Sequence, residues 1–387
     1  GNYDIYVVFV EKGLSLLNPK VRLGFILPHQ FFNAQYGAPL RVILATGKHL
    51  AKVVHFGDQQ VFENATTYTC LMFLDKAGNE AFDFEKVGDL QAWRENIPDA
   101  ADQASIVGTL TSAQVTAVEW NFSVGRGARL FEKLSQMPVK LGDVTHRIFQ
   151  GIKTSADKIY IVEELEHQTG RSKIYSRERE REYWVEPDLF HPLIKGGDSR
   201  RYHLGRTNRL ILFPYSEQAG KTSLIPDKML RKQYPLTWAY LVDNKNYLEN
   251  REDGKMRGER WYGYVYPKAL EVMPLPKIFT PDIASRSSFS LDQTGEAFFT
   301  GGVAGGYGIL VTSEYSREYI LGLLNSKLLE WFIQQIATQM RGGYYSYESR
   351  YIQHLPIAQR SPASSDSLKI SALVERMLNL KRELAAA

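Results

Sequence analysis

Three segments of the chain combine glycine with basic, hydroxyl or aromatic side chains, and this composition suits contact with a nucleic acid. They are FQGIKTSADK (149–158), KMRGERWY (255–262) and RGGYYSY (341–347). Lysine, arginine and threonine donate hydrogen bonds to phosphates and base edges. Glycine lets a backbone approach a ligand closely. The predicted contact residues are Lys153, Thr154, Lys255, Arg257, Arg341, Tyr344 and Tyr345.

Each segment also has a purely structural interpretation. Residues 151–154 would form a β-turn with a solvated Lys153. Residues 341–347 would form a tyrosine-bearing hairpin that packs on the preceding helix. A cation–π cluster on the surface accounts equally well for residues 255–262. The sequence leaves these alternatives open.

The distribution of charge gives a second indication of a polyanionic partner. The chain has 47 Lys and Arg, 43 Asp and Glu, and a net charge of +4. Residues 171–210 hold ten basic and six acidic residues, so this stretch carries the whole excess. It suits binding to a polyanion, although RSKIYSRERERE (171–182) is equally typical of a solvated helix of mixed charge.

Several other functions are disfavoured by the sequence. No apolar run is long enough to span a bilayer, so we expect no membrane association. Cys70 is the single cysteine and is interpreted as a small buried residue, which gives no sign of secretion. No HExxH or paired CxxC motif is present, so no metal site is expected. Pro226-Asp227 with Asp243-Asn244-Lys245 only loosely resembles a nuclease motif. GGVAGGYG (301–308) lacks GxGxxG spacing and is interpreted as a turn between strands.

The elements expected to position these residues fall into two parts. Residues 1–75 predict the order helix, strand, helix, strand, strand, which is the closing half of an open α/β sheet. Within it, the apolar run at 22–27 is typical of a buried parallel strand, and Asn18-Pro19 ends the first helix. A helix is expected over 126–136. Beyond Pro138, short strands alternate with loops, followed by an amphipathic helix over 319–336 and a final helix from about Ser367.

At the level of whole segments, the chain resembles TaqI-type N6-adenine DNA methyltransferases, which occur alone and within type IIG restriction–modification enzymes. YDIYVVFVEKGLSLLNP, RLGFILP and FGDQQVFENATTYTCLMFL resemble the region after the family's catalytic motif. LGDVTHRIFQGIKTSADKIYIV, EPDLFHPLIKGGD, PKIFTPDI, LGLLNSKLLEWFI and GGYYSYESRYIQHLPI resemble its C-terminal specificity, or target-recognition, domain. The implied division is a partial methyltransferase domain (1–125) with the C-terminal half of a Rossmann-like α/β sheet, a linker helix (126–137) and an α+β target-recognition domain (138–387).

The resemblance carries one functional residue onto this chain and leaves two features unmatched. Phe62 aligns with the aromatic residue that stacks on the flipped-out adenine; the alternative is a core phenylalanine at a strand edge. The glycine-containing loop that binds S-adenosylmethionine and the Asn-Pro-Pro-aromatic tetrad have no counterpart, since Asn18-Pro19 is followed by Lys20-Val21. We therefore expect no cofactor-binding residues in this chain.

The resemblance predicts a C-terminal fragment of a prokaryotic, cytoplasmic adenine methyltransferase. The fragment would recognise double-stranded DNA and contribute part of the base pocket. It would be inactive without a missing N-terminal half, and S-adenosylmethionine would serve the intact parent. The alternative from another class is a non-catalytic DNA-binding specificity subunit.

Overall fold

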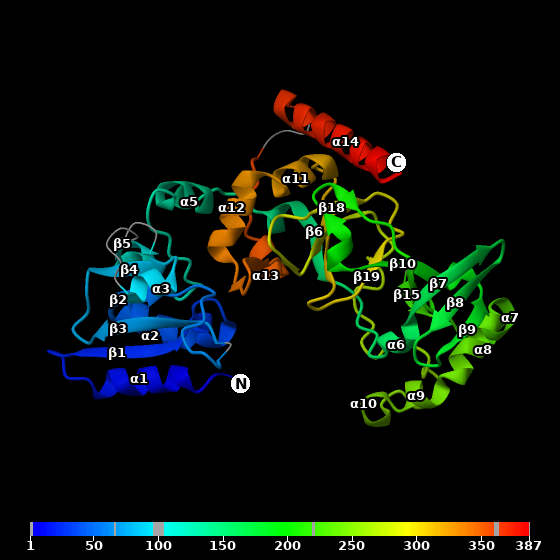
Figure 1. The fold of residues 1–387 in the computed structure, drawn as a ribbon, viewed down its shortest axis with the longest axis horizontal. Helices are drawn as coiled ribbons and strands as arrows, with labels where there is room; N and C mark the ends of the chain where they lie inside the picture. The colour runs from blue at the N-terminus through cyan, green and yellow to red at the C-terminus, as the bar shows by residue number, and fades with distance from the viewer. Residues whose placement is uncertain (1–2, 66, 96–103, 219–220, 360–363, 387) are drawn as a thin grey trace. The chain divides into compact units, whose positions relative to one another are not determined.

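The computed structural model of the chain describes residues 3–386 except 66, 96–103, 219–220 and 360–363, and it separates into two compact units (Figure 1). The first unit comprises Gly1–Gln136 together with Gln334–Gly343. The second comprises Met137–Ile333 together with Tyr344–Ala387. The chain therefore leaves the first unit, returns to it for ten residues, and leaves it again.

Helices and one mixed sheet make up the first unit. Its elements are α1 (Tyr6–Leu16), β1 (Arg22–Pro28), α2 (Ala38–Thr46), β2 (Leu50–His55), β3 (Thr69–Asp75), β4 (Ala81–Val87), α3 (Leu90–Glu95), β5 (Ser105–Thr111), α5 (Ala128–Ser135) and the short β21 (Gln339–Met340). The expected order helix, strand, helix, strand, strand is present as α1, β1, α2, β2 and β3. The helix expected over 126–136 is α5, and α1 ends just before Asn18-Pro19.

The sheet of the first unit has the order β1-β3-β2-β4-β5 among the described strands. β3 is antiparallel to both β1 and β2, and β2 is parallel to β4. The carboxyl ends of β1, β2 and β4 consequently lie at one edge of the sheet, beside the start of β3. In open α/β sheets this edge is where ligands bind.

The interpretation of residues 22–27 as a buried parallel strand is wrong. β1 pairs antiparallel with β3 from Arg22↔Asp75 to Pro28↔Thr69 and lies at one end of the described sheet. Its residues alternate between exposed and partly buried because one face is covered while the other is open. The core of the unit lies under β2 and β3, where Val53, Cys70 and Met72 are completely buried.

The second unit is built mainly from two sheets, one mixed, in which β19 is parallel to β10, and one antiparallel. Among the residues described, six strands follow the order β19-β10-β13-β7-β8-β9 and four follow β18-β16-β20-β6. The strands are β6 (Thr145–Gln150), β7 (Ile161–Gln168), β8 (Arg171–Ser176), β9 (Arg181–Val185), β10 (Phe190–Ile194), β11 (Ser199–Arg200), β12 (His203–Leu204), β13 (Arg209–Leu212), β14 (Tyr215–Gln218), β15 (Lys221–Leu224), β16 (Lys277–Pro281), β17 (Ile283–Ala284), β18 (Ser290–Asp292), β19 (Phe298–Phe299), β20 (Gly306–Val311) and β22 (Tyr344–Ser346).

Helices of the second unit occur in three parts of the chain, namely α6 alone, α7 to α10, and α11 to α14. They are α6 (Asp157–Tyr160), α7 (Asp227–Gln233), α8 (Pro235–Asp243), α9 (Lys245–Glu249), α10 (Arg251–Gly254), α11 (Arg317–Leu324), α13 (Ser349–Ile352) and α14 (Ser365–Ala386); α12 (Lys327–Ile336) runs across the division at 333/334. The expected C-terminal helix is α14, which lies along α11 (Figure 1). The core combines aliphatic residues with buried aromatic side chains such as Tyr160, Tyr240 and Phe299.

The helical alternative for residues 171–182 and the single helix predicted over 319–336 are both wrong. Residues 171–182 form the β8–β9 hairpin instead of a charged helix, with Ser176 paired to Arg181 across the turn. The helix expected over 319–336 is two helices, α11 and α12. Asn325 separates them because its buried amide bonds both the N–H and the C=O of Phe289 (3.1 and 2.9 Å).

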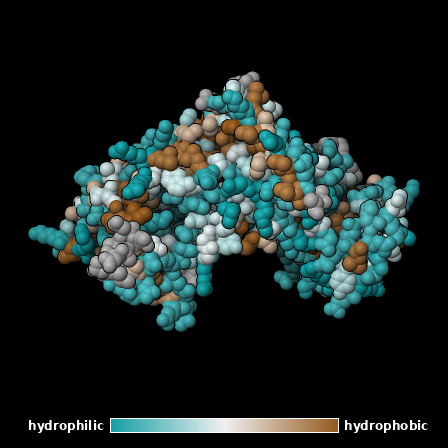
Figure 2. Space-filling model, turned by 45° about the horizontal axis from the view of Figure 1, so that its top comes forward, coloured by the Kyte–Doolittle hydropathy of each residue, from teal (hydrophilic) through white to brown (hydrophobic). Residues whose placement is uncertain are grey.

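Hydrophilic side chains cover most of the molecular face drawn in Figure 2, with smaller hydrophobic areas between them. None of the described helices is both long and apolar enough to cross a membrane.

Candidate nucleic-acid interface

Phe62 lies in the loop that joins β2 to β3, at the edge of the sheet where β1, β2 and β4 end. Its side chain is 49% exposed, and Glu63 and Asn64 beside it are also exposed. The structure therefore contradicts the alternative of a core phenylalanine. An exposed aromatic ring in a loop is available to stack on a planar ligand.

The loop that carries Phe62 is held from several directions within the first unit. Gln59 donates to the carbonyl of Val87 at the end of β4 (3.0 Å) and accepts from the N–H of Leu90 (2.5 Å). Arg94 donates to the carbonyl of Val61 (2.7 Å), the residue directly before Phe62. The backbone next to the exposed ring is thus fixed although the ring itself is open.

Residues 334–343 pack against this same loop. The amide of Gln339 donates to the carboxylate of Asp58 (3.0 Å), and the N–H of Arg341 donates to the hydroxyl of Tyr68 (2.8 Å). Arg341 is exposed and is followed by Gly342 and Gly343, both with positive φ (84° and 75°). The structure brings Arg341 into the unit that carries Phe62, a juxtaposition that the sequence did not indicate.

The prediction of a single loop over 341–347 in the specificity domain is therefore corrected. Arg341 belongs to the first unit, whereas Tyr344 and Tyr345 belong to the second. These tyrosines lie in β22, which pairs antiparallel with β17 (Ala284↔Tyr345). Tyr344 is 46% exposed and Tyr345 partly buried, so Tyr344 has the more accessible ring.

The second unit brings together three basic residues that the sequence singled out. Lys153 forms an isolated β-bridge with Tyr266, and the Lys255 ammonium lies 5.0 Å from the Tyr266 ring centre. Arg257 follows two residues later and donates to Asn250 (2.7 Å). Lys153, Lys255 and Arg257 are all exposed. We call these three residues and Tyr266 the basic cluster.

The basic cluster combines both interpretations of residues 255–262. Lys255 makes a cation–π contact, as the structural alternative expected, and remains exposed. Trp261 and Tyr262 of the same segment are buried in the core, so they offer no surface for stacking. Glu252 accepts from the Tyr266 hydroxyl (2.6 Å) and lies 3.8 Å from the Lys255 ammonium. This single carboxylate offsets part of the local positive charge.

Arg251 is a buried residue that sequence reasoning missed, and it positions both loops of the basic cluster. Its guanidinium donates to four backbone carbonyls at distances of 2.7–3.1 Å, those of Leu248, Thr154, Trp261 and Gly263. Glu252 and Asp253, which follow it, adopt left-handed φ angles of 47° and 60°. Such backbone strain persists only where the surrounding structure imposes it.

Thr154 is withdrawn from the candidate DNA contacts. Its side chain is buried, and its hydroxyl donates to Asp157 and accepts from the N–H of Ala156 (3.0 Å). These bonds stabilise the start of α6 in the way that serine and threonine stabilise turns and helix ends. A buried hydroxyl with both roles filled has no capacity left for a phosphate.

The basic stretch 171–210 is largely neutralised within the second unit. Five of its ten basic residues form ion pairs with carboxylates: Lys173, Arg177, Arg181, Arg201 and Arg209. Arg171 stacks over Trp184, with its guanidinium carbon 4.4 Å from the ring centre. A net charge counted along the sequence therefore overstated the positive surface here.

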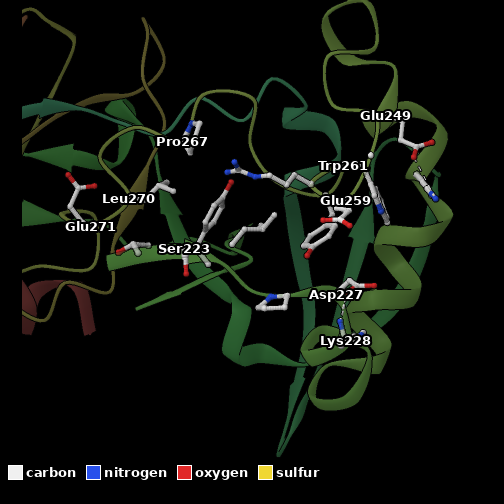
Figure 3. A pocket seen from close by; sticks show the side chains of 17 residues that line it. Ser223, Asp227, Lys228, Glu249, Glu259, Trp261, Pro267, Leu270 and Glu271 are labelled. Atoms are coloured by element: carbon white, nitrogen blue, oxygen red, sulfur yellow. Dashed lines mark hydrogen bonds and ion pairs between the residues drawn. The ribbon is translucent and has the colours of Figure 1, made fainter. Parts of the chain in front are cut away.

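A groove of about 1040 Å³ lies in the second unit, beside β15, α7 and α9. Figure 3 shows Ser223 of β15, Asp227 and Lys228 of α7, and Glu249 of α9 around it. Its lining contains four acidic and three basic residues: Asp227, Glu249, Glu259, Glu271, Lys228, Lys245 and Arg260. With no excess of positive charge, the groove is not assigned to DNA. Asp227 and Asp243 of the nuclease-like pattern are each paired with an arginine.

Cys70 and the glycine-rich segment both have structural roles. Cys70 is completely buried in β3, and burial raises its pKa. Residues 301–305 form the expected turn between β19 and β20. A Cβ on Gly305 would lie 1.7 Å from the carbonyl oxygen of Thr300, so glycine is needed there for backbone packing.

Comparison with known proteins identifies the class to which both parts of the chain are similar. Residues 1–62 match the family described as Eco57I restriction-modification methylase. Residues 191–357 match the TaqI-like C-terminal specificity domain. These matches confirm the resemblance to restriction–modification methyltransferases that the sequence indicated.

Individual relatives agree with that class. The chain is 28% identical over 92% of its length to the type II restriction enzyme and methyltransferase RM.Eco57I of Escherichia coli, of which it covers 36%. It is 23% identical over 92% of its length to the type II methyltransferase M.PaeR7I of Pseudomonas aeruginosa, of which it covers 58%. The chain thus spans less than two thirds of these relatives.

A solved structure shares the fold. The type IIL restriction-modification enzyme MmeI, solved in complex with DNA, matches 98% of this chain with a TM-score of 0.58 and 10% identity; the match covers 45% of MmeI.

Proposed function

We propose that this chain is the DNA-recognition part, and one part of the catalytic domain, of an S-adenosylmethionine-dependent adenine-N6 DNA methyltransferase of a restriction–modification system. The two family matches and the methyltransferase relatives support this assignment. The full-length protein would act on double-stranded DNA in the cytoplasm of a prokaryote, with further methyltransferase residues outside this chain. A type IIG arrangement, with a nuclease on the same polypeptide, is compatible with RM.Eco57I being both restriction enzyme and methyltransferase.

The observation that carries the proposal is the exposed Phe62 on an otherwise anchored loop at the carboxyl edge of the strands. An enzyme that modifies a base in duplex DNA must extrude it and hold it by stacking and by hydrogen bonds to its edge. Phe62 would supply the stacking surface. Arg341, exposed and bonded through its backbone to Tyr68, would contact a phosphate or base edge near the same loop.

The basic cluster of the second unit would contact the DNA backbone. Lys153, Lys255 and Arg257 are exposed, and each would neutralise phosphate charge. Tyr344, on β22, would provide a further aromatic contact, with the less exposed Tyr345 beside it. Phosphate contacts fix the position of the protein on the duplex, and contacts to base edges select the sequence.

The glycine-rich turn at 301–305 is filled by its own backbone, and Asn18-Pro19, the nearest counterpart of the Asn-Pro-Pro-aromatic tetrad, only follows the end of α1. In the full-length protein we assign S-adenosylmethionine binding and the orientation of the adenine amine to residues other than these.

The test is the Phe62→Ala variant in the protein expressed from its full reading frame. Transfer of tritium from labelled S-adenosylmethionine to bacterial genomic DNA measures the rate, and nucleoside analysis identifies the methylated base. Stacking of a base on an aromatic ring contributes about 1–3 kcal/mol, so methylation should fall roughly ten- to a hundredfold.

Ile106→Ala is the matched control, since Ile106 is 48% exposed in the same unit but lies on β5. This control should methylate at the wild-type rate. Equal rates for Phe62→Ala and wild type would remove Phe62 from the base pocket. DNA binding without any methylation of adenine would favour the non-catalytic specificity subunit instead.

A further inference from the structure

Gly57, the second residue of the loop that carries Phe62, is held by two histidines, one at the end of β2 and one directly after β1. The N–H of Gly57 donates to Nδ1 of His55, at the end of β2 (3.1 Å). The carbonyl of Gly57 accepts from Nε2 of His29, which directly follows β1 (3.2 Å). Both backbone polar groups of Gly57 are therefore bound by imidazole rings.

The arrangement defines the chemical state of both rings. A carbonyl oxygen only accepts, so His29 carries its hydrogen on Nε2. His55 accepts on Nδ1, so its hydrogen is on Nε2. The two rings lie together with centres 4.2 Å apart, and burial lowers the pKa of His29 and, more strongly, that of His55. Two neutral imidazoles in contact make a rigid support for the backbone.

His29 also holds the other end of the loop. Its backbone N–H donates to the carbonyl of Tyr68 (3.2 Å), the last residue before β3. The His29 and Tyr68 rings are stacked with centres 6.3 Å apart. Gly57 itself adopts φ +59°, a left-handed conformation that favours glycine. His29 thus binds one residue near the start of the loop and its last residue, while Phe62 between them is exposed.

We propose that His29 and His55 are positioning residues for base capture: they fix the backbone at Gly57 and Tyr68, on either side of Phe62, so that its ring is presented for stacking. The inference rests on the proposed function of Phe62 and adds the residues through which the fold controls it. Neither histidine touches the base or the methyl donor.

The test uses two pairs of variants in the full-length protein. His55→Leu and His29→Leu remove the bonds to Gly57. His55→Asn keeps an acceptor near the position of Nδ1, and His29→Gln keeps a donor near the position of Nε2. Hydrogen–deuterium exchange of the peptide covering 57–68 reports loop order without any need for activity. Thermal unfolding reports whether the fold is retained.

The leucine variants should exchange hydrogen faster in residues 57–68 and lower kcat roughly ten- to a hundredfold, the scale expected when a positioned group moves by about 1 Å. The KM for genomic DNA should stay within about twofold, because phosphate contacts elsewhere set the position on the duplex. The amide variants should restore most of the rate.

Combination with Phe62→Ala decides whether the histidines act through Phe62. In that background His55→Leu should cost little further rate, because the ring it positions is gone. An equal loss in both backgrounds would overturn the inference and leave the role of Phe62 intact. Phe62→Ala without effect would instead refute the proposed role of Phe62 in the base pocket, on which the inference rests. If the leucine variants do not fold, His55→Gln, with its acceptor displaced by one bond, is compared with His55→Asn; equal rates would then overturn the inference.

Discussion

Replacing Arg251 by methionine should strongly destabilise the second unit. The side chain is 5% exposed, and its guanidinium donates to carbonyls from three separate chain segments, at Thr154, at Leu248 and at 261–263. Methionine preserves much of the volume but supplies no donor, so four buried carbonyls would lose their partner.

The magnitude follows from these four bonds and from the cost of burying the charge. Hydrogen bonds from charged groups contribute about 1.5–3 kcal/mol each, but bonds within one network are not additive. Burial of the guanidinium itself opposes folding by several kcal/mol. We expect a net loss of about 3–5 kcal/mol in the free energy of unfolding, because each buried carbonyl left without a donor costs about 1–3 kcal/mol and the relieved burial of the guanidinium offsets part of that sum.

Urea unfolding followed by circular dichroism measures this loss as a lower midpoint at unchanged slope. The free energy of unfolding of Arg251→Lys should lie between those of Arg251→Met and the wild type, because one ammonium cannot reach carbonyls on three segments. Arg257→Met is the control; its side chain is exposed and donates to Asn250, so the free energy of unfolding should change by no more than about 0.5 kcal/mol. A loss below about 1 kcal/mol for Arg251→Met would refute the assignment of Arg251 as the organiser of these loops.

Three further results are expected. Asp292→Ala should lower the free energy of unfolding by about 3–5 kcal/mol, because it leaves the ammonium of Lys277 buried without the carboxylate 2.6 Å away. Glu249→Ala, which breaks the more exposed pair with Lys245, should lower it by only about 0–1 kcal/mol, and thermal unfolding of both variants compares the two losses. Burial and nearby Lys277 lower the pKa of His191 to about 4 in the folded protein. Since the unfolded chain binds this proton from about pH 6.5 downwards, the neutral His191 contributes up to about 3 kcal/mol to the free energy of unfolding above that pH, and this stability is lost as the pH falls towards 4. His191→Phe, which keeps the stack on Phe298, should flatten that part of the stability–pH curve, and an unchanged curve would contradict the assignment. Affinity for mixed-sequence duplex DNA should fall steeply with salt, and Lys153→Ala with Lys255→Ala should reduce the logarithmic slope by about 2; fluorescence anisotropy measures it, and an unchanged slope would remove the basic cluster from the interface.

Local sequence patterns predicted the elements whose burial they encode. The apolar runs of β2 and β3 and the stop at Asn18-Pro19 gave the order of the first unit correctly. β4 was missed because AFDFEKV is rich in charge, although its alternation of buried Phe82 and Phe84 with exposed Asp83 is typical of a half-buried strand. In this segment the two-residue alternation of apolar and polar side chains indicated a strand, whereas the high content of charged residues suggested a loop.

The other differences between the sequence-based predictions and the structure arise from contacts between residues far apart in the chain. The break at Asn325 depends on the backbone of Phe289, 36 residues away, so no helical periodicity could reveal it. The hairpin at 171–185 pairs charges across strands, whereas its spacing in sequence also fits a helix. The burial of Thr154 and the convergence of Lys153 with Lys255 depend on Arg251, a charged residue that a sequence reading places at the surface.

The return of residues 334–343 to the first unit has a consequence for protein engineering. Recombination at a single breakpoint near residue 137 would import Gln339 and Arg341 from the donor while keeping Asp58 and Tyr68 from the recipient. The recognition region is therefore not one contiguous cassette. A chimaera that retains the recipient's own partners for the loop needs junctions at 136/137, 333/334 and 343/344, so that residues 334–343 stay with the loop between β2 and β3 that they contact.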